Sequence, residues 1–341
     1  MLPADERVGK ADPRRRSRVA PVEAIPIHHL RKRRPLRLDA DVPPKTPAAR
    51  ESARTWVQAA GPPLVLVLVL QGAFAVTAVR HQGAVEGWRV ALTVLLFVCD
   101  GIGRRLVNDF EDHRRGVDRP DRVRPDSSMA LGLDMNRVRW AGMGGFAAAW
   151  VCLLVLALTS EPLLLLVIPP MYAAYFAYAG GRRPLGHRGF GELLDFVVTG
   201  TAVTLVIGRL NGDAFDAALW CAALACGFLF MTLMLHNNAR DLAKDREAGK
   251  VTLPHLIPSA AVKALYVTGL AGCYGFLALT ALSLGAWGPL LPLVTLPWAA
   301  LLAVRVCRGP LGTRMIDWSG LYLLMLAVFA TFTAGGWLPA W

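Results

Sequence analysis

The sequence is poor in charged residues, which make up 18% of its 341 positions. Soluble domains usually carry about 25% charged residues, so this composition argues against a soluble globular protein. Hydrophobic residues account for 54% of the chain and the mean hydropathy is +0.41. Intrinsically disordered and collagen-like chains have too few apolar residues for such values, and both classes are excluded.

Cysteine is also sparse, and its six positions form no CxxC pair and no cluster with histidine. A disulfide-rich secreted scaffold and a thiolate metal site both need such clusters. All of the cysteines except Cys307 lie inside apolar runs. We therefore expect them to be small apolar residues within helices.

Positive charge is concentrated at the start of the chain, where residues 1–50 hold 13 Lys and Arg against 6 Asp and Glu. No apolar run follows the first charges, so we expect no cleavable signal peptide. The run RKRR at 31–34 is typical of a cytoplasmic arm that touches anionic lipid. We predict two parts: a basic, disordered arm over 1–58 and a transmembrane domain over 59–341, with no nucleic-acid partner.

Nine apolar segments of near-membrane length follow residue 60, and about 20 residues suffice to cross the hydrocarbon core as a helix. The sequence predicts an all-α integral membrane protein with nine transmembrane helices. The segments run over 62–79, 88–107, 138–159, 162–178, 193–208, 215–235, 261–284, 287–306 and 318–337.

The connections between these segments differ strongly in Lys and Arg content. Placing the N-terminus inside puts 20 Lys and Arg in the inner loops and 3 in the outer ones. Lys and Arg are retained on the cytoplasmic side of membranes. We therefore expect a cytoplasmic N-terminus, cytoplasmic site loops and an outside C-terminus in a bacterial cell membrane.

Acidic residues gather where the second and sixth segments end. Residues 108–118 read NDFEDHRRGVD, and residues 238–253 read NARDLAKDREAGKVTL. Asp109 and Asp112 are three residues apart, and Asp241 and Asp245 are four apart. Both spacings place carboxylates on one helical face, where like charges repel. A cation is therefore expected between them.

Mg²⁺ takes one or two protein carboxylates and completes its shell with water and phosphate oxygens. Two such clusters facing each other are suited to holding Mg²⁺ around a diphosphate. Basic residues near both clusters are candidates for pairing with the phosphate oxygens; these are Arg122, Arg124, Arg240, Arg246 and Lys250.

The two clusters also indicate an internal repeat. Asp109 and Asp241 are 132 residues apart, and each follows the second helix of a predicted four-helix set. Two such sets and one final helix account for the nine segments. Sites at repeat interfaces are common in membrane proteins.

These patterns, NDxxDxxxGxD and NxxDxxxDxxxGKxTL, resemble the two aspartate-rich motifs of the UbiA superfamily of intramembrane prenyltransferases. The third loop, YAGGRRPLGHRGFGE at 178–192, resembles a stretch of its menaquinone-type branch, the 1,4-dihydroxy-2-naphthoate prenyltransferases. The resemblance implies a UbiA-like bundle and a Mg²⁺-dependent enzyme that ionises an isoprenyl diphosphate. It assigns the metal ions to Asn108, Asp109, Asp112, Asp118, Asn238, Asp241 and Asp245, and catalysis to the four aspartates 109, 112, 241 and 245.

Several positions depart from the branch pattern. The stretch RPDSS at 124–128 replaces a Gly-Pro-Leu run, and His187 stands where tyrosine is usual. Asp195 follows Glu192 by one turn, at a position expected to be apolar. An acid inside a spanning helix is a functional candidate by default, so Asp195 is either a base or the ion-pair partner of Arg104 or Arg105. Glu192 is a candidate for acceptor binding or for the base.

Three functions remain open. A UbiA-type transferase would pass the prenyl chain to an aromatic or quinone-precursor acceptor. A UbiA-type terpene synthase would use the same metal site and let the prenyl chain's own double bond capture the cation. A transporter with acidic loops is disfavoured, because transporter sites lie near the bilayer midplane.

Overall fold

The computed structural model describes residues 52–114, 126–179, 184–247, 249–312, 318–336 and 338. All regular elements in this part of the chain are helices, and one isolated bridge joins Arg188 to Val251. The residues before Ser52 lie outside it, whereas Ala53–Ala59, at the end of the predicted arm, form helix α1 capped by the Ser52 hydroxyl.

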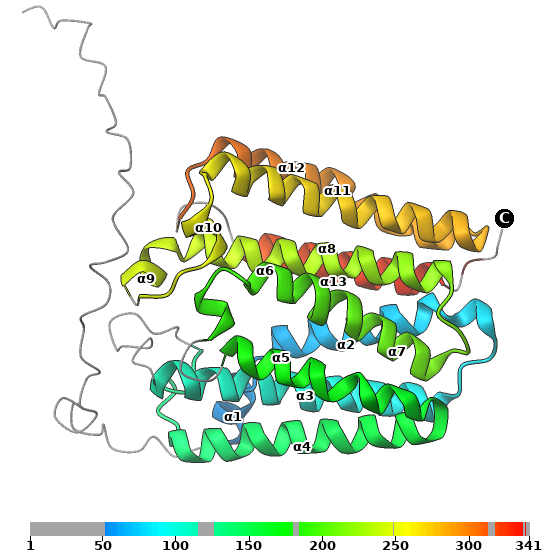
Figure 1. Cartoon of the computed structure of the whole chain (residues 1–341), viewed down its shortest axis with the longest axis horizontal. Helices are drawn as coiled ribbons and strands as arrows, with labels where there is room; N and C mark the ends of the chain where they lie inside the picture. The colour runs from blue at the N-terminus through cyan, green and yellow to red at the C-terminus, as the bar shows by residue number, and fades with distance from the viewer. Residues whose placement is uncertain are drawn as a thin grey trace, which may run out of the picture. The chain divides into compact units, whose positions relative to one another are not determined.

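The chain order of the helices is shown in Figure 1. The α-helices after α1 are α2 (Pro62–Ala78), α3 (Gly87–Arg114), α4 (Met135–Ser160), α5 (Ile168–Ala179), α6 (Gly191–Leu194), α7 (Val203–Asn211), α8 (Ala217–Arg240), α9 (Leu242–Glu247), α10 (Leu253–Leu256), α11 (Ser259–Leu284), α12 (Leu296–Arg308) and α13 (Trp318–Gly335). Short 3₁₀ helices are η2 (Arg80–Gln82), η3 (Pro162–Leu166), η4 (Leu185–His187) and η6 (Gly288–Thr295), and η5 (Asp195–Ala202) is a π-helix.

All nine apolar segments predicted from the sequence are helical in the described residues. Six of these helices are long and apolar enough to cross a membrane, and two shorter apolar helices cover 162–178 and 320–335. Helix α3 spans 28 residues, but charged residues such as Asp100, Arg104 and Arg105 interrupt its apolar run. The helical nature of the chain is confirmed, whereas the number of nine crossings stays a prediction.

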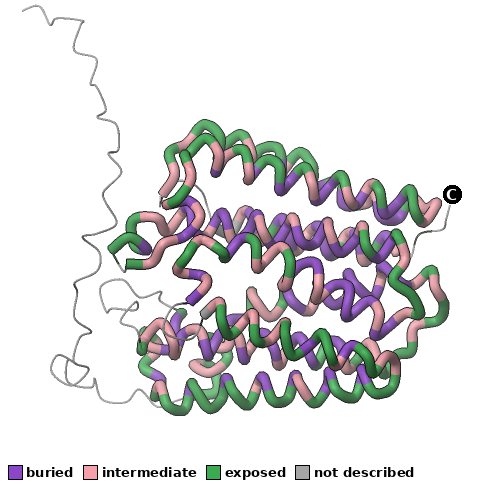
Figure 2. Tube along the Cα trace, viewed as in Figure 1, coloured by how far each residue is buried: buried purple, intermediate pink, exposed green. Residues whose placement is uncertain are grey.

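Helix α8 lies at the centre of the bundle. Of its apolar stretch 67% is buried, against 28% for the stretch that contains α12, and Figure 2 shows this contrast along the trace. Helix α8 packs against α11, η5, α7, α2 and α13. The outward faces of the peripheral helices are apolar; Trp140, Val151 and Leu158 on α4 are each more than half exposed. Such faces are suited to lipid rather than water.

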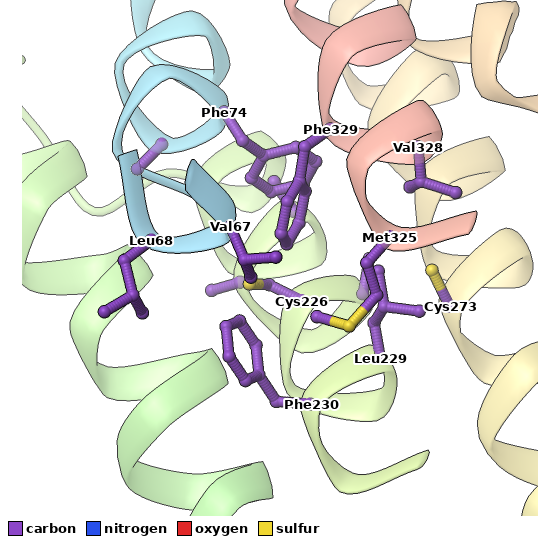
Figure 3. Close-up of a cluster of buried hydrophobic side chains, with 14 of the residues drawn as sticks. Val67, Leu68, Phe74, Cys226, Leu229, Phe230, Cys273, Met325, Val328 and Phe329 are labelled. Carbon is purple, nitrogen blue, oxygen red and sulfur yellow. The ribbon is translucent and has the colours of Figure 1, made fainter. Parts of the chain in front are cut away.

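The main hydrophobic core joins the first long helix to the last. Phe74 of α2 contacts the rings of Phe329 and Phe332 in α13, with ring centroids 5.3 and 4.2 Å apart. Figure 3 shows this core together with side chains from α8 and α11, among them Cys226 and Cys273. Both cysteines are buried free thiols, which agrees with their predicted role as small apolar residues.

A π-helix lies in the middle of the fifth apolar segment. In η5 the Thr201 hydroxyl donates to the carbonyl of Phe196, five residues earlier, at 2.8 Å. Gly200 of η5 lies so close to α8 that a Cβ atom there would stand 2.4 Å from the Cα of Gly227. Two glycines thus let the π-helix approach α8. Single-turn π segments are frequent at functional sites.

The N-terminus of α8 provides a first testable prediction. Asp216 accepts from the backbone N–H of Leu219 at 2.8 Å and from Gln82 at 2.8 Å, and His81 Nε2 lies 2.5 Å away. Partial burial acts to raise the pKa of Asp216, but these hydrogen bonds outweigh it and lower the pKa. Replacing Asp216 with alanine should cost about 1 kcal/mol of stability, measured by thermal unfolding in detergent.

The same residue gives a pH dependence of defined sign. A carboxylate whose pKa is lower in the folded state stabilises the protein above its unfolded pKa, and this contribution is lost as the pH falls. The difference in stability between wild type and Asp216→Ala should therefore shrink in acid. Asp216→Asn keeps a cap and is the control; an unchanged difference across the acid range would contradict the role of the carboxylate.

Candidate functional site

A cavity of about 270 Å³ lies inside the bundle, between α2, α3, α5, η5, α8 and α13. Its charged lining residues are Arg104 and Arg105 of α3, Asp126 before α4 and Asp195 of η5, and polar residues such as Asn108 of α3, Tyr175 of α5 and Asn237 of α8 join them. Most of the other lining residues are apolar, such as Leu68, Phe230 and Leu233. The cavity therefore borders the first acidic motif and the residue before the second one, and it extends into an apolar interior.

The first motif occupies the last two turns of α3. Asn108 lines the cavity, and its amide nitrogen donates to Asp112 Oδ2 at 3.1 Å. This pair presents an amide oxygen and carboxylate oxygens at the cavity end of the helix. The predicted metal ligand Asp118 and the predicted phosphate-binding residues Arg122 and Arg124 lie outside the described residues.

Asp109, which the resemblance assigns to the metal site, is fully buried and does not line the cavity. Its Oδ2 accepts from the backbone N–H of Ser128 at 2.8 Å and from the Ser128 hydroxyl at 2.9 Å. Its Oδ1 lies 3.7 Å from Arg105 Nε, and Arg105 also pairs with Asp126 at 2.9 Å. These contacts attach the segment before α4 to the end of α3.

In the second motif, Asn238 is tied to Glu192 of α6. The Asn238 amide donates to Glu192 Oε1 at 2.9 Å, and both residues are buried. Glu192 Oε2 is buried and has no hydrogen-bond partner among the described residues. The structure thus brings together two residues that the sequence suggested separately.

Asp241 caps the end of α8, and Asp245 follows on α9. Both oxygens of Asp241 accept from Arg240, at 2.9 and 2.5 Å. Asp245 Oδ1 lies 3.5 Å from Lys250 Nζ, whereas its buried Oδ2 has no hydrogen-bond partner in the described part of the chain. Burial raises the pKa of Asp245, and the charge of Lys250 opposes this rise. Arg246 is exposed on α9.

The third loop is held against the second motif. The backbone N–H of Gly189 donates to the carbonyl of Val251 at 3.1 Å. Gly189 has φ +81°, a conformation that glycine adopts without strain. His255 of α10 accepts from the backbone N–H of Thr252 and lies 3.0 Å from the carbonyl of Leu242. These contacts join the described end of the third loop to the segment after the second motif, near α9 and α10 in Figure 1.

Asp195 opens the π-helix and lines the cavity. Its Oδ1 accepts from the Thr199 hydroxyl at 2.9 Å. The alternative pairing with Arg104 or Arg105 is not observed among the described residues, because Arg104 pairs with Asp100 and Arg105 pairs with Asp126. The ion pair is therefore not seen in the described residues, and the role of Asp195 as a base stays a prediction.

The motifs do not include two polar groups, one that lines the cavity and one buried nearby on α3. Asn237 lines the cavity, and its buried Oδ1 has no partner among the described residues. Asp100 is buried on α3, two turns before Asn108, and binds Arg104 and Tyr172. An acid within an apolar segment is a functional signal in itself, and applying that rule to all segments would have identified Asp100 along with Asp195.

The donor set can be compared with the requirements of Mg²⁺. No group of three or more His, Cys, Asp or Glu side chains in the described residues is close enough to enclose a metal ion. Mg²⁺ does not need such a cage, since water and substrate phosphates supply much of its shell. The buried and unpartnered oxygens of Asp245 and Glu192 are uncompensated without a cation or a bound donor. The oxygen-rich donor set therefore fits Mg²⁺ bound together with a diphosphate.

Comparison with known proteins places these features in context. Residues 68–318 match the sequence profile of the "UbiA prenyltransferase family". The 1,4-dihydroxy-2-naphthoate octaprenyltransferase of Mycobacterium tuberculosis is 32% identical over 284 residues, covering 82% of this chain and 95% of the relative. The Mycobacterium leprae protein of the same name is 30% identical, covering 71% and 82%.

Solved structures agree on the fold. A UbiA homolog from Archaeoglobus fulgidus bound to GPP and Mg²⁺ has a TM-score of 0.62 at 15% identity, covering 83% of this chain and 98% of that one. At this identity the likeness concerns the fold alone. The prediction of an all-helical, UbiA-like fold is thus confirmed.

Proposed function

The chain belongs to the UbiA prenyltransferase family, and we propose that it transfers an isoprenyl chain from its diphosphate to an aromatic quinone precursor within the membrane. The observation that carries the proposal is a cavity that is lined by Asn108 of the first motif and by Asn237, the residue before the second motif, and that continues into an apolar interior. A diphosphate belongs at the polar end and a prenyl chain in the apolar part. The names of the mycobacterial relatives support an aromatic acceptor of the dihydroxynaphthoate class.

We propose that Asn108, Asp112, Asn238, Asp241 and Asp245 hold Mg²⁺ with the diphosphate. The bound ions would neutralise the negative charge that develops on the departing diphosphate. Lys250 and Arg240 lie beside the second motif, where their charges favour the same anion. The apolar side chains of the cavity exclude water, which would otherwise capture the allylic cation.

Glu192 and Asp195 are the proposed proton acceptors. A carboxylate that takes the proton of the acceptor must be within reach of it and must not be committed to a cation. Asp195 lines the cavity and accepts one hydrogen bond, from Thr199. Glu192 has one oxygen fixed by Asn238. Asp195 is therefore the better placed of the two.

For the membrane, we propose that all nine apolar segments cross the bilayer, in two sets of four and a final helix. The N-terminus and the site loops face the cytoplasm in this arrangement, and residues 1–58 precede the catalytic domain at 59–341. The asymmetry of Lys and Arg supports the orientation. The orientation can be tested by replacing Arg80 or Arg188 with cysteine and measuring from which side of the membrane each cysteine is accessible. The two positions lie in connections predicted to be on opposite sides of the membrane.

The test of the transferase proposal is a product assay with the purified full-length chain in detergent. It would contain Mg²⁺ and C10, C15 or C20 prenyl diphosphates, with and without 1,4-dihydroxy-2-naphthoate, and the products would be identified by mass spectrometry. We expect no prenylated product until the aromatic acceptor is added. A ring hydrocarbon or terpene alcohol formed without acceptor would contradict the transferase and establish a terpene synthase.

The terpene synthase remains the second candidate, because Asp195 places a carboxylate beside the space where a cation would form. Replacing Asp195 with alanine discriminates between the two functions. In a transferase it should lower kcat by about 10²- to 10⁴-fold, as loss of a general base does, without changing the product. In a cyclase it should change the distribution of products. A variant with unchanged rate and product would remove Asp195 from both mechanisms.

A further inference from the structure

Helix α3 carries an ion pair between Asp100 and Arg104, two turns and one turn before Asn108. Arg104 lines the cavity, whereas Asp100 does not. Asp100 Oδ2 accepts from Arg104 Nε at 2.5 Å, and Asp100 Oδ1 accepts from the Tyr172 hydroxyl at 3.2 Å. Asp100 is buried, with 2% of its surface exposed. Both of its oxygens are therefore committed, and Asp100 is not available to a bound molecule.

Arg104 is in the opposite situation. A guanidinium has five N–H donors, and Asp100 occupies the Nε donor alone. In the described part of the chain no acceptor binds the two terminal amino groups, whereas the guanidinium carbon lies 4.5 Å from the centre of the Tyr175 ring. The plane of the guanidinium is fixed by the Tyr175 ring beneath it and by the hydrogen bond from Nε to Asp100. Its free edge is thus pre-organised for bidentate binding of a planar anion.

Arg104 also lines the space inside the bundle. Arg104 lines both the cavity of about 270 Å³ and a smaller, largely apolar one of about 50 Å³ that shares Tyr175 and Val198 with it. Tyr178 and Phe230 add aromatic surface to the larger cavity. A fixed cation among aromatic side chains matches a flat aromatic acid.

We infer that Arg104 forms an anion-binding subsite that takes the carboxylate of the aromatic acceptor, with Asp100, Tyr172 and Tyr175 as positioning residues. This inference rests on the proposed function and assigns the residue that binds the carboxylate of its acceptor. The diphosphate is the other anion in the cavity, but its site lies at the motifs. Four residues of helix separate Arg104 from Asn108, about 6 Å along the axis.

Asp195 completes the expected pose of the acceptor. Arg104 and Asp195 line one cavity from two different helices, so a hydroxy acid can place its carboxylate on the guanidinium and its hydroxyl near the carboxylate. A phenol without a carboxylate would interact with Asp195 but not with the Arg104 guanidinium. The subsite therefore selects among aromatic acceptors by charge.

The test compares two probes that differ by the carboxylate, 1-hydroxy-2-naphthoate and 1-naphthol. Their binding to the full-length chain in lipid nanodiscs would be measured by isothermal titration calorimetry. Wild type should bind the acid at least about 10-fold more tightly, as expected for a charge-assisted hydrogen bond. Arg104→Gln should bring the two affinities within about 3-fold of each other and leave that of 1-naphthol unchanged. Equal affinities in wild type, or a preference that persists in Arg104→Gln, would overturn the subsite.

A matched control lies on the same helix. Arg89 pairs with Glu86 at 2.8 Å and stacks on Trp88 at 5.5 Å, but it lines neither cavity. Arg89→Gln should keep the full preference for the acid. Arg104→Gln leaves Asp100 as a buried unpaired charge, which can destabilise the fold. The double variant Asp100→Asn/Arg104→Gln removes this charge, so it should stay folded and should also lose the preference for the acid.

Two further arms separate the possible outcomes. Inorganic diphosphate with Mg²⁺ should not displace 1-hydroxy-2-naphthoate; displacement would assign Arg104 to the diphosphate and overturn the inference. A binding preference without prenyl transfer to any acceptor would refute the proposed function while the subsite stands. Equal transfer to 1,4-dihydroxynaphthalene and to its 2-carboxylate, with no binding preference, would refute the subsite and leave the transferase.

Discussion

Replacing Asp112 or Asp241 with alanine is expected to lower kcat by at least about 10³-fold while the protein stays folded in the membrane. Removing one fixed group that stabilises charge in a transition state commonly costs 10²- to 10³-fold, and each of these carboxylates is proposed to act through a metal ion as well. Neither residue is deeply buried: both are partly accessible at the end of their helix. The loss should therefore appear in turnover and not in thermal stability.

The measurement is the rate of prenyl transfer by purified variants, together with the rise in melting temperature that Mg²⁺ and inorganic diphosphate cause. Wild type should show this rise, and Asp112→Ala and Asp241→Ala should reduce it. Glu111→Ala is the matched control, because Glu111 neighbours Asp112 but pairs with the exposed Arg114 at 2.7 Å. Activity above a tenth of wild type in either aspartate variant would remove that residue from the metal site.

Much of this site was predictable from the sequence, because acidic residues at helical spacing next to apolar segments are a local pattern. The pattern placed Asn108, Asp112 and Asp241 near the ends of two helices, and the structure agrees, whereas Asp245 lies on the separate helix α9. It did not predict the break between α8 and α9. There Asp241 caps one helix, and the next turn is joined through the Asp245 N–H to the Asp241 carbonyl at 2.8 Å.

The spacing did not determine which neighbour of the pair Asn108–Asp109 faces the cavity, because successive residues of a helix point about 100° apart. The rotation of α3 is set by its contact with α4. A Cβ on Gly145 would lie 2.8 Å from the carbonyl oxygen of Cys99, and one on Gly103 would lie 3.0 Å from the backbone of Phe146. Small residues of this kind allow close packing of helices in membranes. The rotation of α3 therefore depends on tertiary contacts, which the spacing of its own residues does not reveal.

The polar groups within the apolar segments were harder to interpret for a related reason. The sequence shows that Asp195 and Arg104 interrupt apolar runs, but it leaves open whether they pair with each other. The pairing depends on Asp100, which lies four residues before Arg104 on the same helix and is close enough to occupy its Nε. Asp100 takes the Nε donor of Arg104, and the Asp195 carboxylate accepts from the Thr199 hydroxyl instead.

Replacing Asp109 with alanine is expected to lower both stability and activity, in contrast with Asp112 and Asp241. The side chain is fully buried and accepts two hydrogen bonds from Ser128. Leaving buried donors without their acceptor costs about 1–3 kcal/mol, and more when a charged group is involved. Arg105, whose side chain is 10% exposed, would also lose one of its two carboxylate partners. We expect a clear fall in the melting temperature of the variant.

The variant Ser128→Ala tests whether Asp109 acts through this segment or as a metal ligand. It removes the hydroxyl donor at 2.9 Å and leaves the backbone N–H donor of Ser128 in place. If Asp109 positions the residues between α3 and α4, Ser128→Ala should lose stability and activity, but less than Asp109→Ala does. Asp109→Asn should then also lower the melting temperature. If Asp109 instead binds metal, Asp109→Asn should abolish the stabilisation by Mg²⁺ at an unchanged melting temperature, and Ser128→Ala should be neutral. The burial of Asp109 and its two bonds to one serine favour the first result, because an acceptor already committed to two donors has less capacity to bind a cation.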